Sequence, residues 1–555
     1  MIDRRKALKA LASVPLGSMA VEAAADAVSP SAGTVPEGWM PPTPSQQLQS
    51  GPLRPGPQIF QSIGVEPIIN CRGTFTIIGG SAHRPEVGLA MEAASRYFVQ
   101  MDELAMAVGE RLAELTGAEW GMVSAGCAAG MKHVTAACVS GGNPEKLLRI
   151  PDLTGLEKTE VVFPRSRNSY DAAIKNIGVR MISVNTLEEF TNALSPRTAM
   201  IYLTADQGTS TSPVSLDAIA PIAKAKNIPI LVDAAAQDLT IPNVHLRRGA
   251  TVVAYSGGKV ICGPQCAGLL LGDRNLLMSA WQASSPHHGP GRDNKVGREE
   301  TLGMLAAVEA WVLRDHAAEW KTFVSWLELI AKRLNTIDGV TTQINEPTNL
   351  DNHSPTLRVS WDPARFHITG PEVAEEVGRN RPRIALSGGG GGGGGNAGNA
   401  ANAGLTSITL TAFQMQPGNA QIVADRLHGV LTQKREPKST TMAPPAANIR
   451  GRWNARIQFF NSQSEHLLFI DEQDGNWLQG THRGDFSTRA MRGTIEGNEV
   501  KFQSNYIFSG TLSGDTIAGD VHMGEYLTAK FTATRHDYPD ARVPIVVPKG
   551  PPLAT

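Results

Sequence analysis

The chain has 555 residues, of which 41% are apolar and 19% are charged, and its formal net charge is −1. This length exceeds what one hydrophobic core normally holds, so we expect two or three domains of ordinary globular composition. The balance of 51 basic and 52 acidic residues, with no long basic run, gives no support to a nucleic-acid partner.

Residues 1–27 have the pattern of an export signal. Arg4 and Arg5 precede a short apolar run over 10–20 and small residues over 23–27. The paired arginines resemble a twin-arginine signal, although Ala7 stands where a bulky Phe is commoner. The apolar run is too short to span a bilayer. We therefore expect a soluble periplasmic or otherwise exported protein, and the alternative is a cytoplasmic protein with a disordered basic tail.

Residues 28–60 are rich in Pro, Ser and Gly, which predicts an irregular arm. Residues 61–300 then alternate short apolar runs with helical patterns. This alternation predicts a largely parallel sheet with helices on both faces. The expected strands are 122–123, 160–163, 181–184, 200–203, 228–232, 252–255 and 269–271, and the expected helices are 89–115, 128–139, 187–194 and 216–226.

Residues 301–435 predict a smaller α+β domain that begins with a long helical pattern from Glu300 to Leu334. Within it, Gly388–Gly395 opens a stretch of Gly, Asn and Ala over 388–404. A flexible loop is favoured there over a phosphate-binding loop, because the flanking strand and helix of a phosphate loop are missing.

Residues 436–448 form a predicted linker, after which the apolar period changes to two. Eight short strands separated by turn signals such as Asp474-Gly475 follow over 449–535, and a tail covers 536–555. This pattern predicts an antiparallel sandwich or small barrel that serves as a binding or packing accessory.

The main chemical signal is an apolar strand that ends at Asp233, followed 26 positions later by Lys259 in Ser256-Gly257-Gly258-Lys259. Pyridoxal 5'-phosphate (PLP) needs a lysine amine for a Schiff base and a carboxylate beside its pyridine nitrogen. Lys259 and Asp233 suit these two roles. The two glycines would let the backbone approach the cofactor, and Ser256 can donate its hydroxyl to the phosphate.

Gly126, Cys127 and Ala128 follow one predicted strand and open a predicted helix. Small residues at a helix N-terminus expose backbone amides to an anion, so this turn is a candidate phosphate cup. A tight turn of packing significance alone is an equally weighted alternative.

The five cysteines are too few and too scattered for a disulfide framework. Cys262 and Cys266 are expected to be small buried thiols, because no further ligands follow at zinc spacing. His287 and His288 are expected in a solvated loop rather than at a metal, so no metal site is predicted.

Residues 64–300 resemble the fold-type-I, aspartate-aminotransferase-like PLP enzymes related to selenocysteine synthase (L-seryl-tRNA selenium transferase). The resemblance is closer to the branch that contains D-glucosaminate-6-phosphate ammonia-lyase, and it extends weakly to about residue 432. The matching segments are 69–74, 79–81, 113–119, 256–259, 263–269 and 295–300.

This resemblance implies a large PLP-binding domain, a small C-terminal domain and a homo-oligomer whose active sites lie near subunit contacts. It makes Lys259 the Schiff-base lysine and Asp233 the partner of the pyridinium. It also places Gly126, Cys127 and Ser256 around the phosphate.

The chain departs from true selenium transferases, because residues 75–80 lack the arginine of their T-N-L-G-R motif. Those enzymes also carry an N-terminal tRNA-binding domain, where we expect an export signal and a Pro-rich arm in this chain. The preferred reading is a PLP-dependent lyase that acts on an amino acid or amino-sugar acid by α,β-elimination with ammonia release. The alternatives are a selenium transferase, a PLP-dependent racemase or aminotransferase, and an exported binding protein that keeps the scaffold.

Candidate contacts for the small-molecule substrate come from polar segments near the matched motifs. A polar surface loop is an equally likely reading for 165–171. The candidates are Arg72, Arg167, Asn168, Tyr170 and Arg292.

Overall fold

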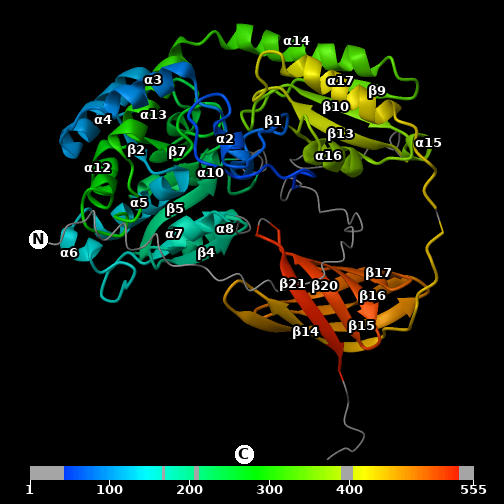
Figure 1. Cartoon of the computed structure of the whole chain (residues 1–555). Coiled ribbons are helices and arrows are strands. Elements are labelled where there is room, and N and C mark those ends of the chain that lie inside the picture. The colour runs from blue at the N-terminus through cyan, green and yellow to red at the C-terminus, as the bar shows by residue number, and fades with distance from the viewer. Residues whose placement is uncertain are drawn as a thin grey trace, which may run out of the picture. The chain divides into compact units, whose positions relative to one another are not determined.

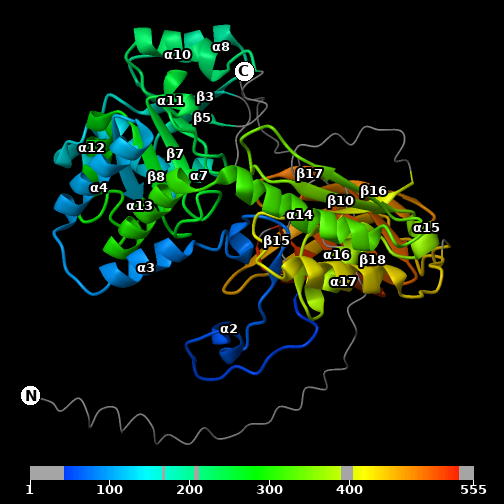
Figure 2. The same cartoon turned by 90° about the horizontal axis from the view of Figure 1, so that it is seen from above.

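The computed structural model describes residues 43–164, 169–205, 212–388, 404–439, 441–524 and 526–536. They fall into two compact units that divide between Met442 and Ala443 (Figures 1 and 2). The predicted export signal and most of the glycine-rich stretch lie outside the described residues. Within these ranges, no helix is long and apolar enough to cross a membrane.

The first unit contains a seven-stranded sheet of order β2-β8-β7-β6-β5-β3-β4. Neighbouring strands are parallel except β8, which is antiparallel to both β2 and β7. The strands are β2 (Trp120–Ser124), β3 (Glu160–Pro164), β4 (Arg180–Val184), β5 (Thr198–Thr204), β6 (Ile230–Asp233), β7 (Val252–Ser256) and β8 (Gly268–Gly272).

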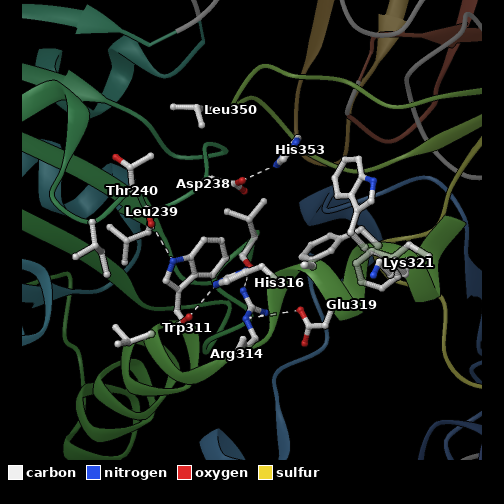
Figure 3. A pocket seen from close by; sticks show the side chains of 17 residues that line it. Asp238, Leu239, Thr240, Trp311, Arg314, His316, Glu319, Lys321, Leu350 and His353 are labelled. Carbon is white, nitrogen blue, oxygen red and sulfur yellow. Dashed lines mark hydrogen bonds and ion pairs between the residues drawn. The ribbon is translucent and has the colours of Figure 1, made fainter.

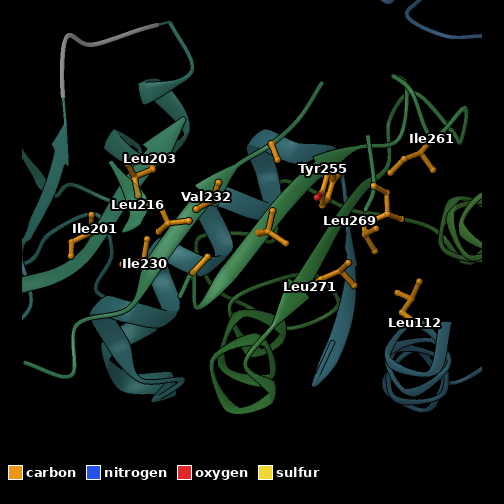
Figure 4. Packing of buried hydrophobic residues seen from close by; sticks show 14 of the residues in the cluster. Leu112, Ile201, Leu203, Leu216, Ile230, Val232, Tyr255, Ile261, Leu269 and Leu271 are labelled. Atoms are coloured by element: carbon orange, nitrogen blue, oxygen red, sulfur yellow. The ribbon is translucent and has the colours of Figure 1, made fainter. Parts of the chain in front are cut away.

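Helices cover both faces of this sheet, because its strand side chains alternate between two apolar clusters. In one cluster, Ile201, Val232 and Leu269 pack with side chains of α4, α8, α10 and α13 (Figure 4). The other takes Tyr202 and Leu231 toward α5, α7 and α12. The helices are α4 (Met101–Thr116), α5 (Cys127–Ser140), α7 (Asp171–Lys175), α8 (Leu187–Ala193), α10 (Leu216–Ala225), α12 (Arg274–Gln282) and α13 (Arg298–Leu313).

Two helices predicted as continuous are each broken in two. The pattern over 89–115 becomes α3 (Pro85–Ala94) and α4, and the pattern after Glu300 becomes α13 and α14 (His316–Leu334). Gln100 accepts a hydrogen bond from the N–H of Glu103, and Asp315 accepts one from Ala318. These polar side chains cap new helix N-termini, a signal that outweighs the continuing apolar spacing.

The small domain packs α14, α16 (Gly370–Arg379) and α17 (Asn419–Thr432) on an antiparallel sheet of order β12-β13-β10-β9. A short strand near the start of the chain, β1 (Ile69–Asn70), pairs in parallel with β11 (Ile384–Ala385) of this domain. The sheet strands are β9 (Thr341–Asn345), β10 (Thr356–Trp361), β12 (Ser387–Gly388) and β13 (Thr406–Thr411).

The second unit is a closed antiparallel barrel of eight strands, in which β14 pairs with both β15 and β21. Alternate side chains fill its interior, including Trp453, Phe502 and Phe508. The strands are β14 (Gly451–Gln458), β15 (Gln463–Asp474), β16 (Trp477–Arg483), β17 (Thr488–Glu496), β18 (Glu499–Gln503), β19 (Ile507–Ser513), β20 (Thr516–His522) and β21 (Ala529–Arg535). The predicted fold class is confirmed, and the barrel replaces the sandwich alternative.

Candidate active site

The predicted cofactor residues gather at one edge of the seven-stranded sheet. Asp233 ends β6 and Ser256 ends β7, while the register aligns Ser256 with Gly268 and Gly268 with Ser124. The carboxyl ends of the parallel strands share this edge, which is where open α/β sheets bind ligands.

Asp233 is a buried carboxylate held by neutral donors. Its Oδ1 accepts hydrogen bonds from the Cys127 thiol at 3.5 Å and from the N–H of Ala235 at 3.1 Å. Its Oδ2 accepts one from the Tyr202 hydroxyl at 3.3 Å. Burial raises the pKa of Asp233 above its usual value, although these hydrogen bonds and the charge of Lys259 act against the rise. A protonated ring nitrogen would supply the strong partner that this carboxylate lacks.

Lys259 lies in a turn that backbone hydrogen bonds hold. The N–H of Gly257 donates to Ala267 O, and that of Cys262 donates to Lys259 O. Within the described ranges, the half-buried Lys259 amine has no hydrogen bond or ion pair. Burial raises the pKa of Asp233 and of Cys127, and a positive charge at Lys259 acts against both rises. The amine is therefore near the carboxylate and free to react.

The two glycines before Lys259 serve protein packing. A Cβ at Gly257 would lie 2.6 Å from Pro264 O, and one at Gly258 would lie 2.7 Å from the Cα of Gln265. The turn 257–259 thus lies directly against the segment 264–267. This contact gives a reason for both glycines that differs from the predicted approach to the cofactor.

The N-terminus of α5 fits a phosphate. Gly126 precedes the helix with φ of 87°, and no side chain caps the first turn. First-turn N–H groups have no partner within a helix, so those of Cys127 and Ala128 are available to an anion. A Cβ at Gly268 would lie 2.6 Å from Cys127 N, so glycine there lets the helix end reach β8 beside Ser256.

Cys127 has a second role that its sequence motif did not reveal. Its side chain is buried and donates to Asp233, and burial raises the pKa of the thiol well above its usual value. The group therefore stays a neutral thiol. Together the free amine, the buried carboxylate, the uncapped helix end and the Ser256 hydroxyl fit PLP, with Lys259 for its aldehyde and Asp233 for its ring nitrogen.

The candidate substrate residues are spread more widely. Arg72 follows β1, with its guanidinium 4.4 Å from the centre of the Phe75 ring, and burial lowers its pKa. The same segment reaches the lysine turn, because Ser81 N donates to Gly258 O at 2.8 Å.

Tyr170 is exposed at the start of α7, and Arg292 donates to the Ser285 hydroxyl on an exposed loop. Arg167 and Asn168 lie outside the described residues. The substrate contacts therefore stay predictions.

Two expectations about other side chains need correction. Cys266 is exposed, whereas Cys262 is buried as expected, because the turn after Pro264 carries Cys266 outward. His287 is not a freely solvated side chain, since its ring lies 3.1 Å from an Asp102 oxygen and 3.0 Å from Trp281 O.

Sequence reasoning missed Tyr202 and Gln237. Gln237 pairs with His245 at 2.7 Å and donates to Asp351 at 2.7 Å, which anchors the chain that leaves Asp233. Tyr202 lies on β5 beside β6, and strand alternation places it on the same face as Asp233. Only the sheet order, which local sequence does not carry, brings these groups together.

A pocket of about 800 Å³ opens beside Val260, the residue that follows Lys259 (Figure 3). Val260 lines it, and Arg314 donates to Val260 O at 3.4 Å. The indole N–H of Trp311 donates to Leu239 O at 2.8 Å, and Asp238 lies 2.6 Å from the His353 ring. These contacts support the segments that follow Lys259 and Asp233.

Comparison with known proteins agrees with this geometry. Residues 90–313 match the family of Cys/Met metabolism PLP-dependent enzymes. D-glucosaminate-6-phosphate ammonia lyase of Salmonella typhimurium is 30% identical over 301 residues, which cover 52% of this chain and 79% of that protein. The 5'-C-glycyluridine monooxygenase-decarboxylase of a Streptomyces species is 31% identical over 347 residues, covering 59% and 83%.

The fold has a solved counterpart. A structure of D-glucosaminate-6-phosphate ammonia-lyase superposes with a TM-score of 0.58 at 24% identity, covering 68% of this chain and 99% of that one. The motifs, the site geometry and the similarity over most of the length of two relatives point the same way. The chain belongs to the fold-type-I family of PLP-dependent enzymes that includes D-glucosaminate-6-phosphate ammonia lyase.

Proposed function

We propose that this enzyme catalyses an α,β-elimination on an amino acid or amino-sugar acid and releases ammonia. The observation that carries the proposal is the Lys259 amine, which has no partner among the described residues, near the buried Asp233 carboxylate, in a chain 30% identical to an ammonia lyase. PLP, when bound, supplies an aldehyde for the substrate amine and an electron sink for charge at Cα.

The residues of the site suit this reaction. Lys259 has no competing partner among the described residues, so its Nζ can take the proton from Cα as a general base. Asp233 holds negative charge next to where a ring proton must stay. Tyr202 and Cys127 fix the carboxylate in position. Loss of a leaving group from Cβ then gives an enamine, whose hydrolysis releases ammonia.

A second outcome has specific support. The Streptomyces relative is as similar as the ammonia lyase, and its name describes oxygenation with decarboxylation. In a reaction of that kind, the bond from Cα to the carboxyl carbon breaks and carbon dioxide leaves in place of the Cα proton, and substrate orientation decides between the two outcomes.

The direct test is a screen of amino acids and amino-sugar acids for ammonia release, with oxygen uptake and carbon dioxide measured in parallel. We expect ammonia without oxygen uptake, and no product from Lys259→Ala. The matched control is Lys226→Ala, which removes an exposed lysine and should turn over normally. Oxygen-dependent carbon dioxide release would assign the second reaction instead, and transfer of selenium to charged seryl-tRNA would revive the transferase.

We further propose that the protein is exported through its twin-arginine-like leader and acts as a homo-oligomer. The leader pattern at Arg4 and Arg5 supports export, and the family resemblance of the sequence, which implies a homo-oligomer, supports assembly. Cell fractionation of the wild type and of a paired Arg4→Lys, Arg5→Lys variant tests export. Light scattering of the purified enzyme tests assembly, and a cytoplasmic monomer would contradict both.

A further inference from the structure

A groove of about 610 Å³ lies on the outer surface of the barrel, across strands β15 to β20. Strand register arranges its side chains in two adjacent rows that run across the strands. One row joins Asp474, Trp477, Thr494, Lys501 and Ser509, and the other joins Glu472, Gln479, Arg492 and Gln503.

The polar ends in this groove are unengaged. Across the described residues, no side-chain hydrogen bond or ion pair involves any of the polar groups at Glu472, Asp474, Gln479, Arg492, Lys501 and Gln503. Two charged pairs do join neighbouring strands elsewhere on the outer face, Arg456 with Glu465 at 2.7 Å and Lys530 with Asp520 at 2.6 Å. The groove thus keeps its donors and acceptors for something outside the barrel.

The composition of the groove selects one class of ligand. Trp477 is 65% exposed and presents an aromatic surface between Asp474 and Thr494 in its row. Two carboxylates, Glu472 and Asp474, balance the two cations, Arg492 and Lys501, so the groove has no net attraction for an anion. The amides of Gln479 and Gln503 offer both donors and acceptors.

An exposed indole beside unpaired amides and charges of both signs matches a sugar ring, which has an apolar C–H face and a rim of hydroxyls. A peptide strand cannot add to this barrel by backbone pairing, because the closed barrel has no free edge. A nucleic acid would require net positive charge. We propose that the groove is a binding site for neutral saccharide chains, a function separate from the PLP chemistry.

Affinity electrophoresis of the full-length protein tests the proposal, with soluble starch, hydroxyethyl cellulose and galactomannan as neutral probes and heparin as the anionic comparison. We expect at least one neutral gel to retard the protein and heparin to have no effect. Trp477→Ala and Arg492→Ala should each weaken retardation about tenfold or more. Their melting curves and ammonia release should match those of the wild type, since both side chains are on the surface.

The matched control is Phe486→Ala, which removes a fully exposed aromatic side chain outside the groove and should bind as the wild type does. Absence of retardation in all three neutral gels would overturn the proposal. If Phe486→Ala and Trp477→Ala lost retardation equally, the binding would be nonspecific adsorption through exposed aromatic side chains, which would also overturn the proposal. Binding to heparin alone, abolished by salt, would identify a polyanion site and would also overturn it.

Discussion

Both units bury ionisable side chains, but the hydrogen-bond partners of these side chains differ between the two units. In the barrel, His466 Nδ1 lies 2.9 Å from His482 Nε2, and the other nitrogen of His482 lies 2.9 Å from the Ser504 hydroxyl. These groups satisfy one another. In the α/β unit, the donors to Asp233 within the described part of the chain are neutral, and the nearby Lys259 amine has no partner there.

This difference distinguishes a structural polar cluster from a site prepared for a ligand. A closed network stabilises its own fold and gains nothing from a further partner. An unpaired amine, a buried carboxylate and an uncapped helix end all gain when a cofactor arrives. Substitutions in the first region should therefore affect stability, and those in the second should affect PLP binding or turnover.

The largest effect is expected for Asp233→Asn. The amide cannot stabilise a ring proton, so we expect turnover to fall roughly a hundredfold, about 2.7 kcal/mol, with folding retained. Steady-state kinetics with saturating PLP would measure this. The matched control is Asp217→Asn, which removes an exposed carboxylate paired with Arg248 and should leave turnover unchanged. If the two variants turned over equally fast, Asp233 would not be the residue that stabilises the ring proton.

The barrel should lose stability in acid. Burial is the main cause that lowers the pKa of His482 to about 4, and the nearby His466 adds to the effect. Burial also lowers the pKa of His466, although Asp485 favours the charged form of that ring and acts against the lowering. A depressed histidine pKa means that the unfolded state binds the proton first. The stabilisation is therefore complete above pH 6.5 and is lost as the pH falls toward 4, by on the order of 2 kcal/mol.

Hydrogen exchange of barrel peptides across this pH range would measure that loss. His482→Gln keeps hydrogen-bonding capacity without titrating, so its exchange protection should change less with pH. An unchanged pH profile in this variant would place the acid sensitivity elsewhere.

Gly268→Ala should weaken PLP binding by about tenfold, roughly 1.4 kcal/mol. Its Cβ would lie 2.4 Å from the carbonyl carbon of Gly126 and must displace the start of α5. Titration of the apo-protein with PLP gives the affinity. Wild-type affinity in a correctly folded variant would show that this helix end does not hold the phosphate.

The smallest effect is expected for Gly429→Ala, in the exposed part of α17, where an added Cβ meets nothing within 4 Å. Alanine reduces the backbone entropy lost on folding, so the variant should be about 0.5–1 kcal/mol more stable. Urea unfolding would measure the gain, and unchanged PLP affinity makes this the matched control for Gly268→Ala.

Local sequence predicted the functional groups better than their surroundings. Asp233 and Lys259 carry local signals, and the structure has Asp233 at the end of β6 and Lys259 in a hydrogen-bonded turn. The Cys127 thiol reaches Asp233 only because β8 and β7 lie between β2 and β6. This order depends on long-range pairing, which apolar periodicity does not encode.

The closure of the barrel also depends on long-range strand pairing. The period of two predicted its strands, but closure depends on β14 pairing with β21, the two strands most distant in the sequence of that unit. Helix ends were misplaced for a different reason, since the apolar spacing continues across the caps at Gln100 and Asp315.

The central claim is that PLP is held on the Lys259 amine, and one measurement tests it most directly. The purified protein is treated with borohydride, which fixes PLP to the amine that carries it, and is then digested and sequenced by mass spectrometry. We predict a single phosphopyridoxyl group, on Lys259. A stable modification on another lysine, or none in protein that has been saturated with PLP, would contradict the account.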